Sequence, residues 1–171
     1  KQKNNNLTEI ELILNKLNEG IILLDSNLKV KLFNNGAEII MNKEGVNVIG
    51  KPIEEIIRHS QLDLSIKEAI DKKTSQEKEI IIHGNEDIII NIYIKAIFKD
   101  KNLDIILIVM SDITKIKKLE RVRKEFVENV SHELKTPITL INGFLETIKT
   151  EALSKKQKEE FFEIITKQSK R

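Results

Sequence analysis

The chain has 171 residues, of which 40% are hydrophobic and 33% charged, and its 29 basic and 27 acidic residues nearly cancel. A chain this apolar is not disordered, and interleaved charges of both signs argue against nucleic-acid binding, which needs a clustered basic surface. The absence of cysteine excludes disulfide scaffolds, thiolate metal sites and thiol nucleophiles. Because no apolar run approaches the ~20 residues that span a bilayer, we expect a soluble piece of a longer protein.

Residues 1–19 are predicted to form an N-terminal linker helix, because their apolar residues recur at helical spacing. Thr8 and Glu11 have the spacing of a capping box, and Gly20 is expected to stop the helix. The apolar residues of this pattern are Leu7, Ile10, Ile13, Leu14 and Leu17.

Residues 20–113 are predicted to form one α+β domain, in which helices flank a five-stranded antiparallel sheet. Alternation of apolar residues with lysines, as in residues 28–32, indicates a strand with one buried face. The run over 105–110 is continuously apolar, which is typical of a central strand covered on both faces. The predicted strands are residues 21–24, 28–32, 79–83, 87–98 and 103–110. The predicted helices are residues 37–41, 52–57 and 63–72.

Residues 114–171 are predicted to form a helical hairpin. An apolar stripe of near-heptad spacing runs through the first helix, and the second helix follows a capping box formed by Ser154 and Gln157. Two helices are too thin to bury both apolar stripes, so we expect two chains to form a dimeric four-helix bundle. The apolar residues are Ile116, Leu119, Val122, Phe126, Val130, Leu134, Pro137, Ile141, Leu145 and Ile148 in the first helix and Phe161, Phe162, Ile164 and Ile165 in the second.

The polar side of the first helix carries the candidate chemistry. At about 100° per residue, His132 lies almost opposite the apolar stripe, Thr136 lies one turn along on the same face, and Glu133 flanks His132. If this segment is helical, the geometry excludes a core histidine. Pro137 either ends the helix or bends it one turn past His132, and the stripe that continues in phase to Ile148 favours the bend.

These residues carry a family resemblance. The seven-residue string SHELKTP, from Ser131 to Pro137, resembles the H-box of sensor histidine kinases of two-component systems. The wider segment 126–148 is similar to the class found in phosphate-regulon and cell-wall sensor kinases. The preceding domain ends in Asp112-Ile113-Thr114 and resembles a PAS sensor domain, so the resemblance covers nearly the whole chain.

The resemblance implies a role for each H-box residue. His132 would be the phosphoacceptor, whose neutral ring attacks the γ-phosphorus of ATP, and Glu133 would act as the general base. Thr136 would position water for hydrolysis of the phosphorylated partner, and Pro137 would supply a bend that helps the helix switch. For Lys135, a solvated surface lysine is favoured over a phosphate contact.

The resemblance also implies what lies outside the sequence. The ATP-binding catalytic domain is absent, so this fragment is expected to bind no cofactor and to be inactive alone, while ATP and magnesium belong to that domain of the parent protein. The implied partners are a second copy of the chain, the receiver domain of a response regulator and the parent's catalytic domain, with no nucleic acid. The parent is expected to be a membrane-anchored bacterial sensor with this portion in the cytoplasm.

One alternative from a different class stays open. The chain could be a non-enzymatic PAS ligand-binding or dimerisation module with a helical tail that only joins two subunits. His59 and His83 could then be imagined as haem ligands, but polar neighbours and an adjacent turn favour exposed histidines, so no metal site is predicted. The isoleucine-rich interior is expected to be simple core.

Overall fold

The chain divides into two compact units at the bond between Lys117 and Lys118, inside helix α5 (Thr114–Thr150). The computed structural model describes residues 9–10, 12–84, 86–150 and 154–169. Each unit has its own architecture: the first is built on a sheet and the second is helical. The three-part division of the sequence, at residues 19/20 and 113/114, stays a prediction.

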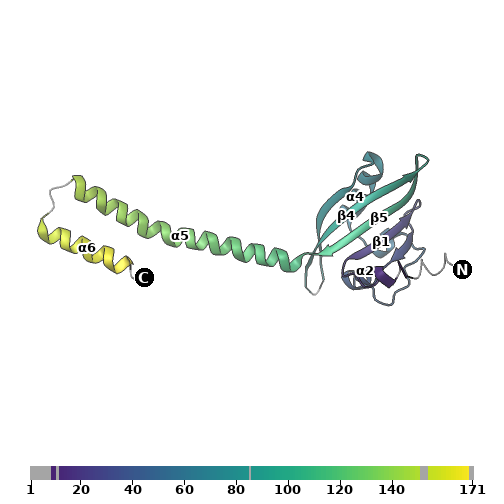
Figure 1. Cartoon of the computed structure of the whole chain (residues 1–171), viewed down its shortest axis with the longest axis horizontal. Coiled ribbons are helices and arrows are strands. Elements are labelled where there is room, and N and C mark those ends of the chain that lie inside the picture. The colour runs from purple at the N-terminus through teal and green to yellow at the C-terminus, as the bar shows by residue number, and fades with distance from the viewer. Residues whose placement is uncertain (1–8, 11, 85, 151–153, 170–171) are drawn as a thin grey trace. The chain divides into compact units, whose positions relative to one another are not determined.

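The first unit contains a five-stranded sheet in the order β2-β1-β5-β4-β3, and every neighbouring pair of strands is antiparallel (Figure 1). The sheet therefore confirms the predicted α+β class and strand number, with β5 at its centre. The strands are β1 (Gly20–Asp25), β2 (Val30–Phe33), β3 (Gln76–Ile82), β4 (Ile88–Lys99) and β5 (Asn102–Asp112).

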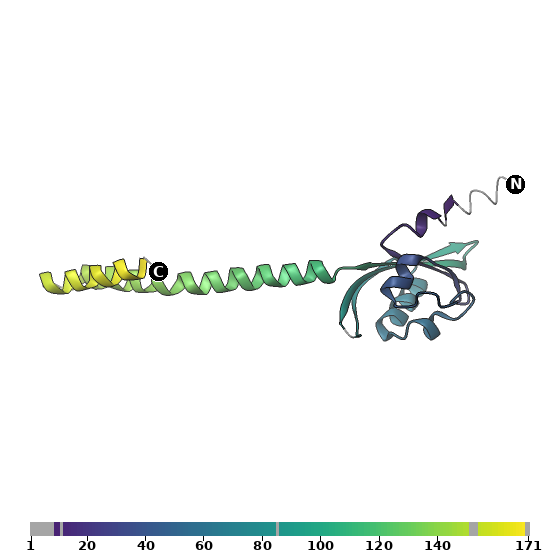
Figure 2. The same cartoon turned by 90° about the horizontal axis from the view of Figure 1, so that it is seen from below.

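One face of the sheet is covered by helices (Figure 2). They are α2 (Asn35–Ile40), α3 (Ile53–Ile56) and α4 (Ser60–Lys72), and α4 packs on β3 and β4. Alternate residues of β1, β4 and β5 meet these helices and are less than 2% exposed, each contributing about 1.5–3 kcal/mol by burial. The strand residues of this core include Ile22, Leu24, Ile90, Ile92, Ile94, Ile106, Ile108 and Met110.

The opposite face of β5 corrects one expectation from the sequence. Ile106 and Ile108 are fully buried, whereas Ile105, Leu107 and Val109 on the other face are only partly buried. The continuously apolar run is therefore central in the sheet but covered on one side in this chain. The run is unbroken because the residues on the second face of β5 are apolar too, although that face is only partly buried.

Gly20 does not stop a helix, contrary to the prediction. Residues 9–10 and 12–14 are helical, and Gly20 is already the first residue of β1. A Cβ atom at this position would lie 2.7 Å from the terminal methyl of Met110 and 3.0 Å from the Cα of Ala37, so close packing favours glycine. The expected capping residues Thr8 and Glu11, together with Leu7, lie outside the described residues.

Asn34 fastens the segment that precedes β1 to the sheet. Its side-chain oxygen accepts hydrogen bonds from the backbone N–H groups of Ile21 (2.7 Å) and Ala37 (3.0 Å), which also caps α2. Its amide donates to the carbonyls of Leu14 (2.8 Å) and Glu19 (3.0 Å). The side chain is only 2% exposed, and its four hydrogen bonds offset the cost of removing the amide from water.

The second unit consists of most of α5 and of α6 (Lys155–Ser169). Helix α5 continues through Pro137, which shows that this proline does not end it. Ser154 and Gln157 form the predicted capping box: the Ser154 N–H donates to the Gln157 side chain (3.0 Å) and the Gln157 N–H to the Ser154 hydroxyl (3.4 Å). Among the described residues, the helices contain no segment apolar and long enough to span a bilayer.

The apolar stripe of α5 is open to solvent in the single chain. Leu119 is 70% exposed, Phe126 66% and Leu134 56%, which leaves large apolar side chains without a covering layer. The side chains of Ile148, Phe161 and Ile165, which the sequence assigns to the stripes, lie outside the described residues. The dimeric four-helix bundle that would cover the stripe stays a prediction.

Candidate functional site

His132 lies in the middle of α5, on an exposed helical position. Exposure alone does not distinguish it, because stripe residues such as Phe126 are exposed as well. The decisive feature is the position of His132 around the helix axis. Because α5 is uninterrupted from Thr114 to Thr150, His132 lies on the side of the helix away from the stripe. Any partner that covers the stripe therefore leaves the imidazole in water.

Hydroxyl groups in the helical turns before and after His132 contact backbone carbonyls of α5. The Ser131 hydroxyl donates to the carbonyl of Val127 (2.7 Å), and the Thr136 hydroxyl lies 3.5 Å from the carbonyl of His132 itself. Pro137 has no N–H, so the carbonyl of Glu133 receives no helical hydrogen bond. The helix is thus weakened one turn beyond the histidine.

The side chains near His132 line a shallow hollow on the surface of α5. The residues at this hollow include a histidine, a lysine and two threonines. Glu133, at the next position along the helix, is also exposed, and its side chain leaves the helix about 100° around the axis from that of His132. The residues that line the hollow are His132, Lys135, Thr136, Thr139 and Leu140.

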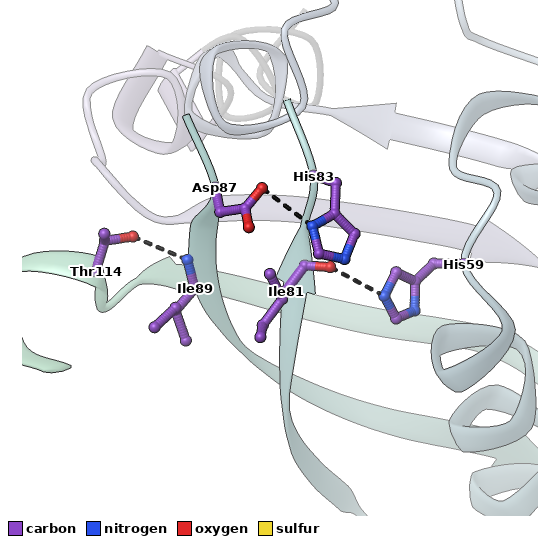
Figure 3. Close-up of polar contacts among 6 residues, drawn as sticks. All are labelled: His59, Ile81, His83, Asp87, Ile89 and Thr114. Carbon is purple, nitrogen blue, oxygen red and sulfur yellow. Dashed lines mark hydrogen bonds and ion pairs between the residues drawn. The ribbon is translucent and has the colours of Figure 1, made fainter. Parts of the chain in front are cut away.

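The start of α5 is fastened to the sheet by Asp112-Ile113-Thr114. The Asp112 carboxylate accepts hydrogen bonds from the N–H (2.8 Å) and the hydroxyl (2.5 Å) of Thr114. The same hydroxyl accepts from the N–H of Ile89 on β4 (2.9 Å) (Figure 3). The N–H of Ile113 donates to the Ile89 carbonyl (2.9 Å). The first residues of α5 are therefore tied to β4.

The other two histidines differ from each other. His83 is exposed near the end of β3, as predicted, and its Nδ1 lies 3.0 Å from an oxygen of Asp87. His59 is only partly exposed: its Nε2 lies 3.3 Å from the Ile81 carbonyl, and its Nδ1 is buried without a partner (Figure 3). Within the described part of the chain, His, Asp and Glu side chains form no group of three that could hold a metal ion.

Asp63 in the first turn of α4 gives a pH-dependent prediction. Burial raises the pKa of Asp63, Glu54 adds to the rise, and Lys67 and His59 oppose it. The folded state then binds the proton more tightly than the unfolded state, so the ionised carboxylate costs stability above the folded pKa, and this cost disappears as the pH falls through it.

Asp63→Asn should therefore flatten the dependence of the free energy of unfolding on pH between about pH 4 and 7, because the variant cannot ionise. Urea denaturation at several pH values measures this slope. The matched control is Asp71→Asn, an exposed aspartate on the same helix, which should keep the slope of the parent chain. Equal slopes for the two variants would contradict the inference.

Comparison with known proteins assigns the first unit. Residues 10–114, more than half of the chain, match the PAS domain family. The chain belongs to the PAS domain family. Directly after the PAS domain, residues 122–171 match the His Kinase A (phospho-acceptor) domain, and this range includes His132. The recognition of both domains from the sequence is thereby confirmed.

Two curated relatives are named as sensor proteins. The phosphate regulon sensor protein PhoR of Pseudomonas aeruginosa is 34% identical over 133 residues, which cover 77% of this chain and 28% of the relative. The sensor protein kinase WalK of Staphylococcus saprophyticus is 28% identical over 144 residues, which cover 84% of this chain and 23% of the relative. The chain thus spans about a quarter of the length of these relatives.

Solved structures confirm the PAS fold. The PAS domain of BvgS from Bordetella pertussis has a TM-score of 0.52 and 14% identity, and the match covers 73% of this chain and 98% of that one. A PAS domain from Colwellia psychrerythraea has a TM-score of 0.53 and 17% identity, with coverage of 64% and 98%. The predicted α+β fold with a five-stranded antiparallel sheet is therefore correct as a PAS fold.

Proposed function

We propose that this chain is the sensor and phosphoacceptor portion of a two-component sensor histidine kinase. The observation that carries the proposal is the position of His132: it lies within the phospho-acceptor match, on one continuous helix that starts at the exit of the PAS domain. A change in the PAS domain can reach His132 through that helix without a break in secondary structure.

In the proposed reaction, a neutral ring nitrogen of His132 attacks the γ-phosphorus of ATP. An N–P bond forms, the bond between the γ-phosphorus and the bridging oxygen breaks, and ADP leaves. Glu133 orients the ring and takes the proton from the other ring nitrogen, which stops positive charge from building up on the imidazole. The phosphoryl group then passes to an aspartate of a response regulator, with loss of the N–P bond.

We infer that the parts needed for turnover lie outside this chain. ATP and magnesium are assigned to a separate catalytic domain, and this chain is assigned no cofactor of its own. Two copies would pair through the exposed stripe of α5 and through α6, as a homodimeric four-helix bundle. We place the chain in the cytoplasm, as part of a membrane-anchored bacterial sensor, with no role in nucleic-acid binding.

The exposed stripe of α5 also supports a second candidate function. Large apolar side chains such as Leu119 and Phe126 would serve equally well in a PAS module that only dimerises. The two candidates differ in one outcome: supplied with the catalytic domain and Mg-ATP, the chain takes up phosphate only if the kinase proposal is correct. Absence of uptake by a dimeric, folded chain would favour the dimerisation module.

Thr136 provides a test of the reverse reaction. In the proposed mechanism its hydroxyl positions the water that hydrolyses the phosphorylated response regulator, so Thr136→Ala should lower that hydrolysis roughly tenfold or more. Phosphorylation of His132 should be little changed, since the hydroxyl is not needed for attack on ATP. Rates of regulator dephosphorylation and of kinase autophosphorylation measure the two effects separately.

Thr139→Ala is the matched control for Thr136→Ala, because Thr139 lines the same hollow three residues further along α5. It should leave both rates close to those of the parent protein. An equal loss of hydrolysis in both variants would assign the effect to the surface as a whole and would contradict the specific role of Thr136.

A further inference from the structure

The first turn of α5 is attached to the PAS sheet at a second place, on a different strand. Lys117 Nζ lies 2.7 Å from an oxygen of Glu79 on β3, and both residues belong to the first compact unit. The first attachment, through Thr114, holds β4. Helix α5 therefore leaves the sheet fastened to two neighbouring strands by two independent contacts.

The two strands differ in how firmly they are held. In the sheet, β4 lies between β5 and β3, whereas β3 is at the edge and has only β4 as a neighbour. β3 also packs on α4, and His59, directly before α4, contacts the carbonyl of Ile81 on β3 (Figure 3). An edge strand held by a helix can shift when that helix shifts, and β4 cannot do so as easily.

Glu79 is placed to pass such a shift to α5. Its neighbour Ile80 is 1% exposed and packs in the core, so a rearrangement in the domain interior moves this part of β3 directly. Glu77, two residues earlier on the same face of the strand, is held differently, since its carboxylate accepts a hydrogen bond from Asn91 (2.8 Å) on β4. Of these two acidic residues, Glu79 is the one paired with α5.

The strength of the contact suits a reversible link. The side chains of Lys117 and Glu79 are 32% and 52% exposed, so water competes for both charges and the pair forms and breaks at low cost. A half-exposed ion pair changes an equilibrium by about two- to fivefold. That is enough to bias a two-state helix but not enough to decide whether the domain folds.

We propose that the Glu79–Lys117 ion pair is a positioning contact that couples the edge strand of the PAS domain to the phosphoacceptor helix. When β3 holds Lys117, the first turn of α5 is fixed to both strands, and when the pair opens, the attachment to β4 through Thr114 remains. These two attachments bias the balance between phosphorylation of His132 and dephosphorylation of the response regulator. The inference rests on the proposed kinase function.

Charge reversal tests the coupling in the whole kinase that contains this chain. Glu79→Lys and Lys117→Glu should each shift the ratio of autophosphorylation rate to regulator dephosphorylation rate by about two- to fivefold in the same direction. The double variant, which restores the pair with reversed charges, should return the ratio to that of the parent. High salt should reduce the difference between single variants and parent.

Glu77→Lys is the matched control, because it makes the same charge change on the same strand face without touching Lys117. It should leave the ratio unchanged. The neutral variants Glu79→Gln and Lys117→Met replace the reversals if either lowers the melting temperature of the PAS domain. A purely structural role would change melting and lower both rates together, without rescue by the double variant.

The outcomes separate the two proposals. If the parent kinase is phosphorylated on His132 and its single-reversal variants keep the parent ratio, or the double variant shows the sum of the single effects, the coupling is overturned and the kinase function stands. If the parent takes up no phosphate on His132, the proposed function itself fails.

Discussion

His132→Gln will abolish phosphate uptake by the kinase that contains this chain. The expected loss is complete, because glutamine keeps a polar side chain of similar reach but has no nucleophilic ring nitrogen. The side chain is exposed on α5, so the substitution should leave the fold intact. Incorporation of labelled phosphate from ATP, together with an unchanged circular dichroism spectrum, measures both expectations.

His83→Gln is the control for this experiment. His83 is also exposed, and it lies beside a carboxylate, that of Asp87. It is on the PAS domain, however, away from the phospho-acceptor match. The control should take up phosphate at the parent rate. If His132→Gln still took up phosphate, His132 would not be the phosphoacceptor.

Glu133→Gln should slow phosphorylation of His132 by about 10²–10⁴-fold, the usual contribution of a general base. Glutamine can still accept a hydrogen bond from the ring but cannot take its proton. The effect should appear in the rate of the chemical step, measured by single-turnover phosphorylation at saturating ATP, because Glu133 is not assigned to ATP binding.

Glu128→Gln removes an equivalent charge one turn and a half before Glu133 on the same exposed helix. Glu128 lies 3.9 Å from Lys124, an exposed pair that contributes little. A rate near that of the parent is expected for this variant. If both glutamines slowed the reaction equally, the general charge of the helix rather than proton transfer would be responsible.

The fold was predictable where the signal was local. Alternation of apolar and polar residues located the strands, but the second strand begins at Val30 rather than at Leu28. The reason is the turn: Asp25 accepts hydrogen bonds from the N–H groups of Asn27 (2.8 Å) and Lys29 (2.9 Å), and Leu28 has a left-handed φ of 59°. The Lys29 N–H lowers the pKa of Asp25, which marks the same turn.

Contacts between residues distant in sequence could not be predicted. Gly20 resembled a helix stop, and only the packing of β1 against Met110 and α2 explains why glycine is favoured there. His59 resembled an exposed histidine, and its contact with Ile81 appears only when β3 lies beside α4.

The candidate site was predictable because it lies on one helix. His132, Glu133, Thr136 and Pro137 are all within six residues, so helical periodicity alone fixes their relative directions. The ion pair between Glu79 and Lys117 joins a strand to a helix across 38 positions of sequence, and no spacing rule connects them. The relative directions of these side chains therefore follow from the sequence, whereas the contact between α5 and β3 appears only in the structure.

Direct location of the phosphoryl group tests the central claim most closely. The kinase that contains this chain is incubated with Mg-ATP, digested at alkaline pH, where an N–P bond survives, and its peptides are fragmented in a mass spectrometer. We expect the added phosphate on the imidazole of His132. Phosphate on Ser131, Thr136 or another histidine, with His132 unmodified, would contradict the account.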